Sequence, residues 1–102
     1  MESIASKTYT IDEIKNIITP IAELHGVKRV YLFGSYARGD ATENSDIDLR
    51  IDRGKIRTLF DLGGFYSDLE EGLNKSIDVV TDDGLVDSFY DEIKHEEIEI
   101  YG

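Results

Sequence analysis

Residues 32–49, LFGSYARGDATENSDIDL, join two segments that predict β-strands. Residues 28–33 carry β-branched and aromatic side chains, which are typical of a mostly buried strand. Residues 46–52 alternate strictly: Ile47, Leu49 and Ile51 share one face, and charged side chains share the other. The stretch therefore predicts two strands, with a glycine turn and a short helix between them.

Helical patterns flank this stretch on both sides. Residues 10–25 repeat isoleucine and leucine at helical spacing, and Thr10 with Glu13 forms a capping box at the start. Pro20 lies inside the pattern and is expected to kink or shift the helix, because it lacks a backbone donor. Residues 56–73 return to the helical period. The sequence therefore predicts one helix before the first strand and one after the second.

The remaining segments complete the expected fold. Residues 76–81 predict a third short strand, and a last helix is expected after the turn at residues 81–84, ending near residue 96. The order α-β-(short α)-β-α-β-α predicts an α+β fold in which helices pack against a small mixed sheet of three or slightly more strands. No repeat or linker divides residues 1–102, so a single domain is expected.

Composition limits the classes of function. The chain has 22 acidic and 11 basic side chains, a net charge of −11, and no cysteine. This balance argues against non-specific nucleic-acid binding, which needs Lys and Arg to neutralise phosphates. Without cysteine there is no disulfide, thiolate nucleophile or Cys-ligated zinc. The N-terminus lacks a signal-peptide pattern, and no apolar run is long enough to span a membrane, so a cytoplasmic location is expected.

Gly34 and Ser35 follow the first predicted strand. A glycine there lets the backbone approach an anion closely, and free amides at the following helix start attract phosphate. The Ser35 hydroxyl adds a donor at the same place. Taken alone, a Gly-Ser pair after a strand is more often an ordinary turn than a phosphate site.

Three carboxylates form the second candidate feature. Asp46 and Asp48 project from one face of a strand, with Cα atoms roughly 6.6 Å apart, and their repulsion is usually relieved by a hard divalent cation such as Mg²⁺. Asp78 lies between apolar Ile77 and Val79 on the third strand. If the two strands are neighbours, all three carboxylates converge. The alternative for each is a solvated position on an open strand or sheet face.

Together these elements resemble the nucleotidyltransferase superfamily that includes DNA polymerase β. The resemblance is closest to the minimal nucleotidyltransferases, the MNT proteins encoded beside HEPN-domain toxins. It extends roughly from Ile11 to Tyr101. The matching segments are Leu-Phe-Gly-Ser at 32–35, Ala-Arg-Gly at 37–39, Ser-Asp-Ile-Asp-Leu at 45–49 and Ile-Asp-Val-Val at 77–80.

The resemblance implies a role for each motif residue. Gly34 and Ser35 are expected to hold the triphosphate of a nucleotide, which is ATP in the MNT proteins. Asp46 and Asp48 are expected to bind Mg²⁺, and Asp78 corresponds to the third carboxylate. Two metal ions would then promote an in-line attack by a hydroxyl on the α-phosphorus, with pyrophosphate leaving.

The resemblance also implies a partner. MNT proteins of this kind act as antitoxins that transfer AMP from ATP to a tyrosine hydroxyl of a HEPN-domain RNase, which silences the toxin. A hetero-oligomer with that toxin is therefore expected, and an acidic protein suits a basic RNase surface. Two alternatives remain open: an antitoxin that neutralises by binding alone, and a nucleotidyltransferase with a small-molecule acceptor.

Residues around the motif admit two interpretations each. Arg38 is suited to bind phosphate, but a structural ion pair with Asp40, Glu43 or a helix end is nearly as well supported. Tyr36 has the ring to stack on a base, although packing against the sheet edge is favoured.

Arg50 shares the polar strand face with the aspartates. There it either pairs with them and offsets their repulsion or contacts substrate, and the ion pair is favoured. His25 and His95 lie at predicted helix ends, where a surface or capping role is favoured over catalysis.

Overall fold

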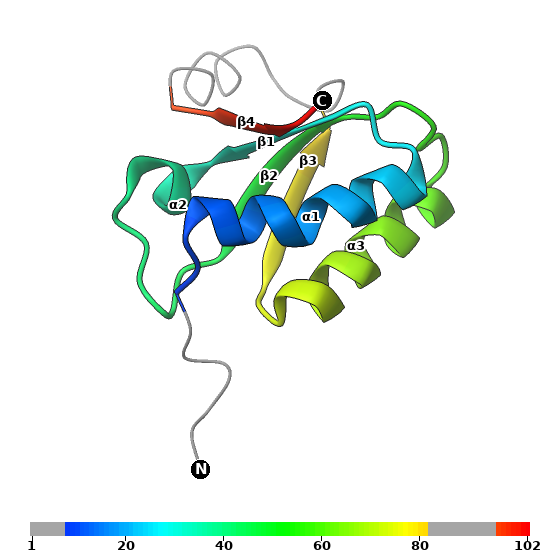
Figure 1. Ribbon diagram of the computed structural model, residues 1–102. Helices are drawn as coiled ribbons and strands as arrows, with labels where there is room; N and C mark the ends of the chain where they lie inside the picture. The colour runs from blue at the N-terminus through cyan, green and yellow to red at the C-terminus, as the bar shows by residue number, and fades with distance from the viewer. Residues whose placement is uncertain (1–7, 82–95) are drawn as a thin grey trace.

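Two long helices lie against one face of a four-stranded mixed sheet in the computed structural model (Figure 1). The structure describes residues 8–81 and 96–102. The strand order is β3-β2-β1-β4. β1 pairs antiparallel with both β2 and β4, and β2 pairs parallel with β3. The strands are β1 (Arg29–Phe33), β2 (Ile47–Asp52), β3 (Ile77–Thr81) and β4 (Ile98–Tyr101).

The first helix, α1 (Ile11–His25), confirms the predicted capping box. The Thr10 hydroxyl accepts a hydrogen bond from the Glu13 amide at 3.1 Å, and the Glu13 carboxylate accepts one from the Thr10 amide at 2.8 Å. The helix continues through Pro20 as one element and ends at Gly26, whose φ of 72° suits glycine. His25 is therefore the last helical residue, as the sequence predicts.

The other helices are α2 (Gly34–Arg38) and α3 (Leu59–Leu73). The sequence places the start of α3 at residue 56, whereas the structure begins it at Leu59. Thr58 caps the helix: its hydroxyl accepts from the Asp61 amide at 3.1 Å, and the Asp61 carboxylate accepts from the Thr58 amide at 3.2 Å. The cap fixes the helix start because it satisfies backbone donors that lack a partner in the first turn.

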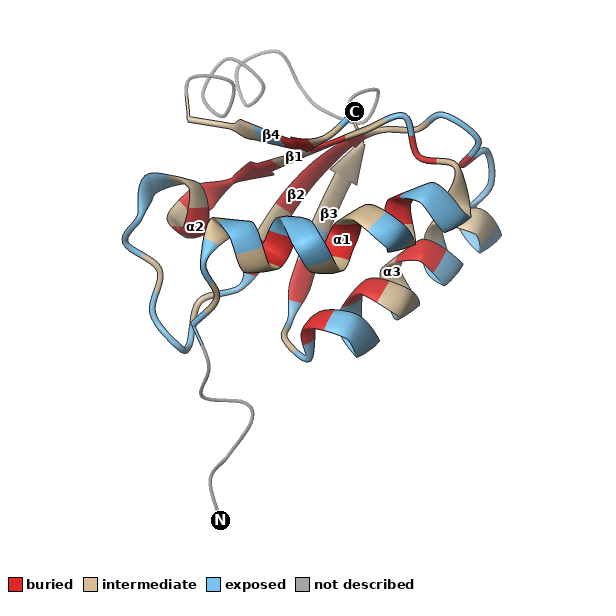
Figure 2. Cartoon of the chain, in the orientation of Figure 1, coloured by how far each residue is buried: buried red, intermediate tan, exposed pale blue. Residues whose placement is uncertain are grey.

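The core lies between the sheet and the two long helices, and buried residues line the helix faces that turn toward the sheet (Figure 2). The strict alternation in β2 has the predicted result, since Ile47, Leu49 and Ile51 are all fully buried. They pack with apolar side chains of α1 and α3, among them Ile18 and Phe65. The opposite face of β2 is thereby left to the charged side chains.

The predicted α+β class and the first three strands are confirmed, but the sheet has one strand more than the predicted order. β4 joins the free edge of β1, with a register shift between Val30 and Tyr31. The sequence analysis ended the expected last helix near residue 96 and predicted no strand after it, so it missed this four-residue strand. That helix itself lies outside the described residues. Within the described part of the chain, no helix is long and apolar enough to cross a membrane.

Candidate functional site

The candidate site is a corner of the sheet where the end of β1 meets the beginnings of β2 and β3. Phe33, the last residue of β1, pairs with Asp48 of β2, and Asp48 pairs in turn with Asp78 of β3. Gly34 follows directly and starts α2. Residues that lie far apart in the sequence thus meet at one place because of strand register alone.

Gly34 is the residue that the backbone of this corner requires. Its φ of 75° lies in the left-handed region, which favours glycine. A Cβ atom at this position would clash with the Asp48 carboxylate oxygen Oδ2. The glycine therefore lets the chain turn from β1 into α2 while the Asp48 carboxylate lies against its backbone.

Asp48 and Asp78 are held as a like-charged pair. Burial is the largest cause that raises the pKa of Asp48 from 3.8 to about 6, and Asp78 contributes to the same rise through its charge and a shared hydrogen bond. Asp46 adds to the rise in this pKa, whereas the charge of Arg38 opposes it. Burial and like charge together make the ionised form of Asp48 unfavourable. Carboxylates in such surroundings are typical of sites that bind a cation or exchange a proton.

The donor chemistry of this corner suits a hard divalent cation, because Asp46, Asp48 and Asp78 offer only carboxylate oxygens. Asp46 is exposed just before β2, and Asp78 is exposed on the edge strand β3. Among residues 8–81 and 96–102, no three acidic or histidine side chains already form a complete coordination set. The residue types therefore fit a metal ion, and Asp48 and Asp78 are the two possible ligands that the strand pairing places opposite each other.

α2 places the remaining motif residues beside Gly34. The Ser35 carbonyl accepts hydrogen bonds from the Gly39 and Asp40 amides at 3.0 and 3.1 Å, which close the short helix. Tyr36 is buried against the core, so the packing role favoured by the sequence is confirmed. Ser35 itself remains partly exposed next to Gly34.

Arg38 makes the structural ion pair with Asp40 that the sequence allowed, at 3.4 Å. It also pairs with Glu96, whose carboxylate accepts from Arg38 Nη1 at 3.2 Å and from the Gly34 amide at 3.1 Å. Sequence reasoning missed Glu96. Its contact with Gly34 spans 62 residues and depends on β4 lying beside β1, which no local pattern indicated.

Arg50 forms the favoured ion pair, but with partners other than the motif aspartates. Its guanidinium donates to Glu97 at 2.8 and 2.9 Å and to Asp52 at 3.1 Å, and it lies 4.1 Å from the centre of the Tyr31 ring. Its side chain is 5% exposed. Arg50 therefore shares a strand face with Asp48, as predicted, and joins β2 to the segment that leads into β4.

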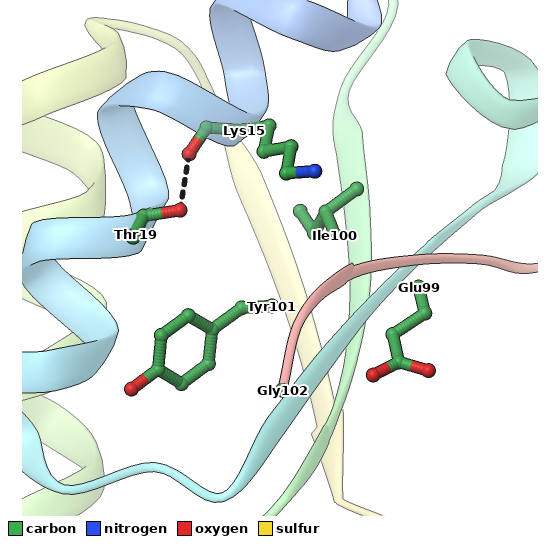
Figure 3. A pocket seen from close by; sticks show the side chains of 6 residues that line it. All are labelled: Lys15, Thr19, Glu99, Ile100, Tyr101 and Gly102. Carbon is green, nitrogen blue, oxygen red and sulfur yellow. Dashed lines mark hydrogen bonds between the residues drawn. The ribbon is translucent and has the colours of Figure 1, made fainter.

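A hollow also lies between α1 and the edge strand β4 (Figure 3). It is lined by Lys15, Thr19, Glu99, Ile100, Tyr101 and Gly102. None of the motif residues lines it. The Thr19 hydroxyl within it donates to the Lys15 carbonyl at 2.7 Å, so that polar group is already used within α1.

Comparison with known proteins agrees with this geometry. The Nucleotidyltransferase domain family matches residues 14–100. A candidate protein adenylyltransferase of Methanocaldococcus jannaschii is 42% identical over 90 residues, which cover 88% of this chain and 97% of that protein. The protein adenylyltransferase MntA of Thermococcus cleftensis is 35% identical over 80 residues, covering 74% of this chain and 81% of that protein. The chain belongs to the nucleotidyltransferase domain family, which is a family of transferases.

Solved structures share the fold. A candidate minimal nucleotidyltransferase matches with a TM-score of 0.77 and 30% identity, covering 90% of this chain and 97% of that one. A toxin–antitoxin complex with AMP-PNP matches with a TM-score of 0.74 and 21% identity, covering 86% of this chain and 73% of that one. The MNT antitoxin bound to the tri-AMPylated HEPN toxin of Shewanella oneidensis has a TM-score of 0.70 and 17% identity, covering 91% and 73%.

Proposed function

We propose that this chain transfers AMP from ATP to a tyrosine hydroxyl of a HEPN-domain partner and so acts as its antitoxin. The observation that carries the proposal is the corner where Gly34, Asp48 and Asp78 meet in a chain of the nucleotidyltransferase family. Relatives named as protein adenylyltransferases support the type of acceptor. The complex of an MNT antitoxin with a tri-AMPylated HEPN toxin, which shares the fold, supports the partner.

The nucleotide's triphosphate would bind at the start of α2. The Gly34 amide and the Ser35 hydroxyl donate hydrogen bonds to phosphate oxygens, and the Arg38 guanidinium adds a positive charge a turn later. The left-handed turn at Gly34 matters because it leaves no side chain between the backbone and the phosphate. The fold match to a toxin–antitoxin complex with AMP-PNP is consistent with ATP as the nucleotide.

Asp46, Asp48 and Asp78 would hold magnesium, as a pair of ions. When bound, the metal would neutralise negative charge on these carboxylates and on the phosphates of the nucleotide. The raised pKa of Asp48 supports this assignment, since a bound cation offsets the part of the rise that comes from Asp78 and Asp46.

The reaction itself is a displacement at the α-phosphorus. The tyrosine oxygen of the partner forms a bond to that phosphorus, the bond to the bridging oxygen breaks, and pyrophosphate leaves. The hydroxyl proton passes to Asp78, which is the exposed member of the carboxylate pair on the edge strand. Gly34 and Ser35 hold the leaving pyrophosphate in place while the bonds exchange.

The partner would form a hetero-oligomer with this chain. A net charge of −11 favours association with a basic RNase surface. Only three of the 22 acidic side chains are assigned to the metal, so most of the negative charge remains available for such a surface.

The test is incubation of the chain with labelled ATP, Mg²⁺ and a HEPN-domain protein from the same organism as the candidate partner. Label on a partner tyrosine is expected with the wild type, and none is expected with Asp48→Asn. If Asp48→Asn still neutralises the toxin in cells, the antitoxin acts by occlusion and AMP transfer is not its mechanism. Label on a small molecule instead of the partner would overturn the proposed acceptor.

A further inference from the structure

Glu96 occupies the donors that the proposed function assigns to a phosphate. Its carboxylate oxygen Oε1 lies 3.1 Å from the Gly34 amide and 3.2 Å from Nη1 of Arg38, and its other oxygen lies 3.4 Å from the same Nη1. A carboxylate that bridges a backbone amide and a guanidinium makes the same kind of charge-assisted hydrogen bonds as a phosphate oxygen would make there.

Glu96 contacts the same glycine that lies against the Asp48 carboxylate. Gly34 already lies against the Asp48 carboxylate, and Asp48 is paired with Asp78. Glu96 therefore brings another negative charge to a corner where carboxylates already crowd one another. Arg38 is the cation that it meets there, and Arg38 is shared with Asp40.

The neighbouring residue holds Glu96 at this place. Glu97 accepts two hydrogen bonds from the buried Arg50 guanidinium, at 2.8 and 2.9 Å, and its side chain is 11% exposed. β4 begins one residue later, at Ile98, which pairs with Leu32 of β1. Glu97 and Ile98 thus hold the backbone next to Glu96, while the Glu96 side chain itself is 29% exposed to solvent.

We propose that Glu96 is an intramolecular competitor for the polyphosphate of the nucleotide, which must displace the Glu96 carboxylate from Gly34 and Arg38 before it binds. The inference rests on the proposed function, because it takes Gly34 and Arg38 as phosphate donors. Release of Glu96 costs its hydrogen bonds to two residues and leaves the Arg50–Glu97 pair intact. Glu96 thereby lowers the affinity for nucleotide without contributing to the fold of the sheet.

The test compares the wild type with Glu96→Gln and with a matched control, Glu99→Gln. The Glu96→Gln substitution keeps the length of the side chain and an oxygen that accepts from the Gly34 amide, but it removes the charge that competes with phosphate. Glu99 is exposed on β4, opposite Tyr31, so Glu99→Gln removes an equal charge from the strand itself. The probes are AMP-PNP with Mg²⁺, pyrophosphate with Mg²⁺, and adenosine, each titrated by calorimetry.

Glu96→Gln is expected to bind AMP-PNP and pyrophosphate about tenfold more tightly than the wild type, since a charge-assisted hydrogen bond no longer has to be broken. Glu96→Gln is expected to bind adenosine as the wild type does. Glu99→Gln is expected to bind all three probes with wild-type affinity. Equal or weaker AMP-PNP binding by Glu96→Gln, with binding by the wild type intact, would overturn the competitor role alone. No binding of AMP-PNP by either protein would overturn the proposed function and this inference with it.

The contact between Glu96 and the Gly34 amide can also be tested by NMR, independently of nucleotide affinity. In a ¹⁵N-labelled sample of the free protein, the Gly34 amide resonance is expected to shift on Glu96→Ala, which removes the acceptor, and to reach the same position in both proteins once AMP-PNP is bound. A Gly34 resonance that is unchanged by Glu96→Ala in the free protein would contradict the contact.

Discussion

Replacing Asp48 by asparagine is expected to stabilise the protein when no divalent metal is present. The Asp48 carboxylate is half-buried beside Gly34 and paired with Asp78. Burial, then Asp78, and then Asp46 raise its pKa from 3.8 to about 6, so the ionised form is disfavoured in the folded state. Asparagine keeps the shape and removes the charge, and therefore removes this cost.

The size of the effect follows from the pKa of Asp48. A rise from 3.8 to about 6 corresponds to about 3 kcal/mol at 1.36 kcal/mol per pKa unit. Because the side chain is partly exposed, solvent screening reduces this to about 1–2 kcal/mol. The cost is absent below pH 3.8, where the carboxyl is protonated in both states, grows as the pH rises toward 6, and is complete above pH 6.

The assay is thermal unfolding in EDTA at pH 8 and pH 5. At pH 8 the Tm of Asp48→Asn is expected to exceed that of the wild type by about 5–10 °C, and at pH 5 by about half as much. Glu71→Gln, which removes an equal charge from an exposed position of α3, is expected to change stability by less than about 0.5 kcal/mol. An equal or lower Tm for Asp48→Asn at pH 8, or a gain that does not fall at pH 5, would refute the reasoning.

Three further substitutions, one of them with a matched control, test the structure. Gly34→Ala is expected to lower the free energy of unfolding by about 1–3 kcal/mol and to abolish AMP transfer, because the new Cβ meets the Asp48 carboxylate at a residue with positive φ. The control is Gly63→Ala, where nothing lies within 4 Å of the new Cβ, and urea unfolding should show a gain of about 0.5–1 kcal/mol. Arg50→Ala is expected to cost about 3 kcal/mol by the same method, because Glu97 stays buried without its bidentate partner; a loss under about 1 kcal/mol would argue against that pair. Thr58→Ala should lower stability by about 1 kcal/mol through loss of the α3 cap, and an unchanged urea midpoint would contradict the cap.

The sequence predicted the parts of the fold that depend on local periodicity. The alternation in β2 and the capping box of α1 were readable because each depends on residues a few positions apart. The convergence of Asp46, Asp48 and Asp78 was predicted on the condition that their strands are neighbours, and the parallel pairing of β2 with β3 meets that condition. The pairing brings Asp48 and Asp78 together, but within the described residues the three carboxylates do not form a set that could hold a metal ion. Which strands lie next to each other depends on the arrangement of the whole sheet, and the alternation of side chains within one strand does not specify it.

The parts that the sequence did not predict depend on long-range contacts. β4 is only four residues long, and its position is fixed by pairing with β1, which is far away in the sequence. The contacts of Glu96 with Gly34 and of Glu97 with Arg50 follow from that pairing, because both glutamates stand just before β4. In an acidic chain, no local signal distinguishes Glu96 and Glu97 from the many other acidic residues.

The most direct test of the central claim is transfer of AMP by the purified protein to the HEPN-domain partner proposed for it. The two proteins are incubated with ATP labelled at the α-phosphate and with Mg²⁺, and the label on the partner and the pyrophosphate released are both counted. Wild type and Glu71→Gln are expected to give equal amounts of label and pyrophosphate, with the label on tyrosine, whereas Asp48→Asn should give neither. Label transfer by Asp48→Asn at the wild-type rate, or none by folded wild type, would contradict the account.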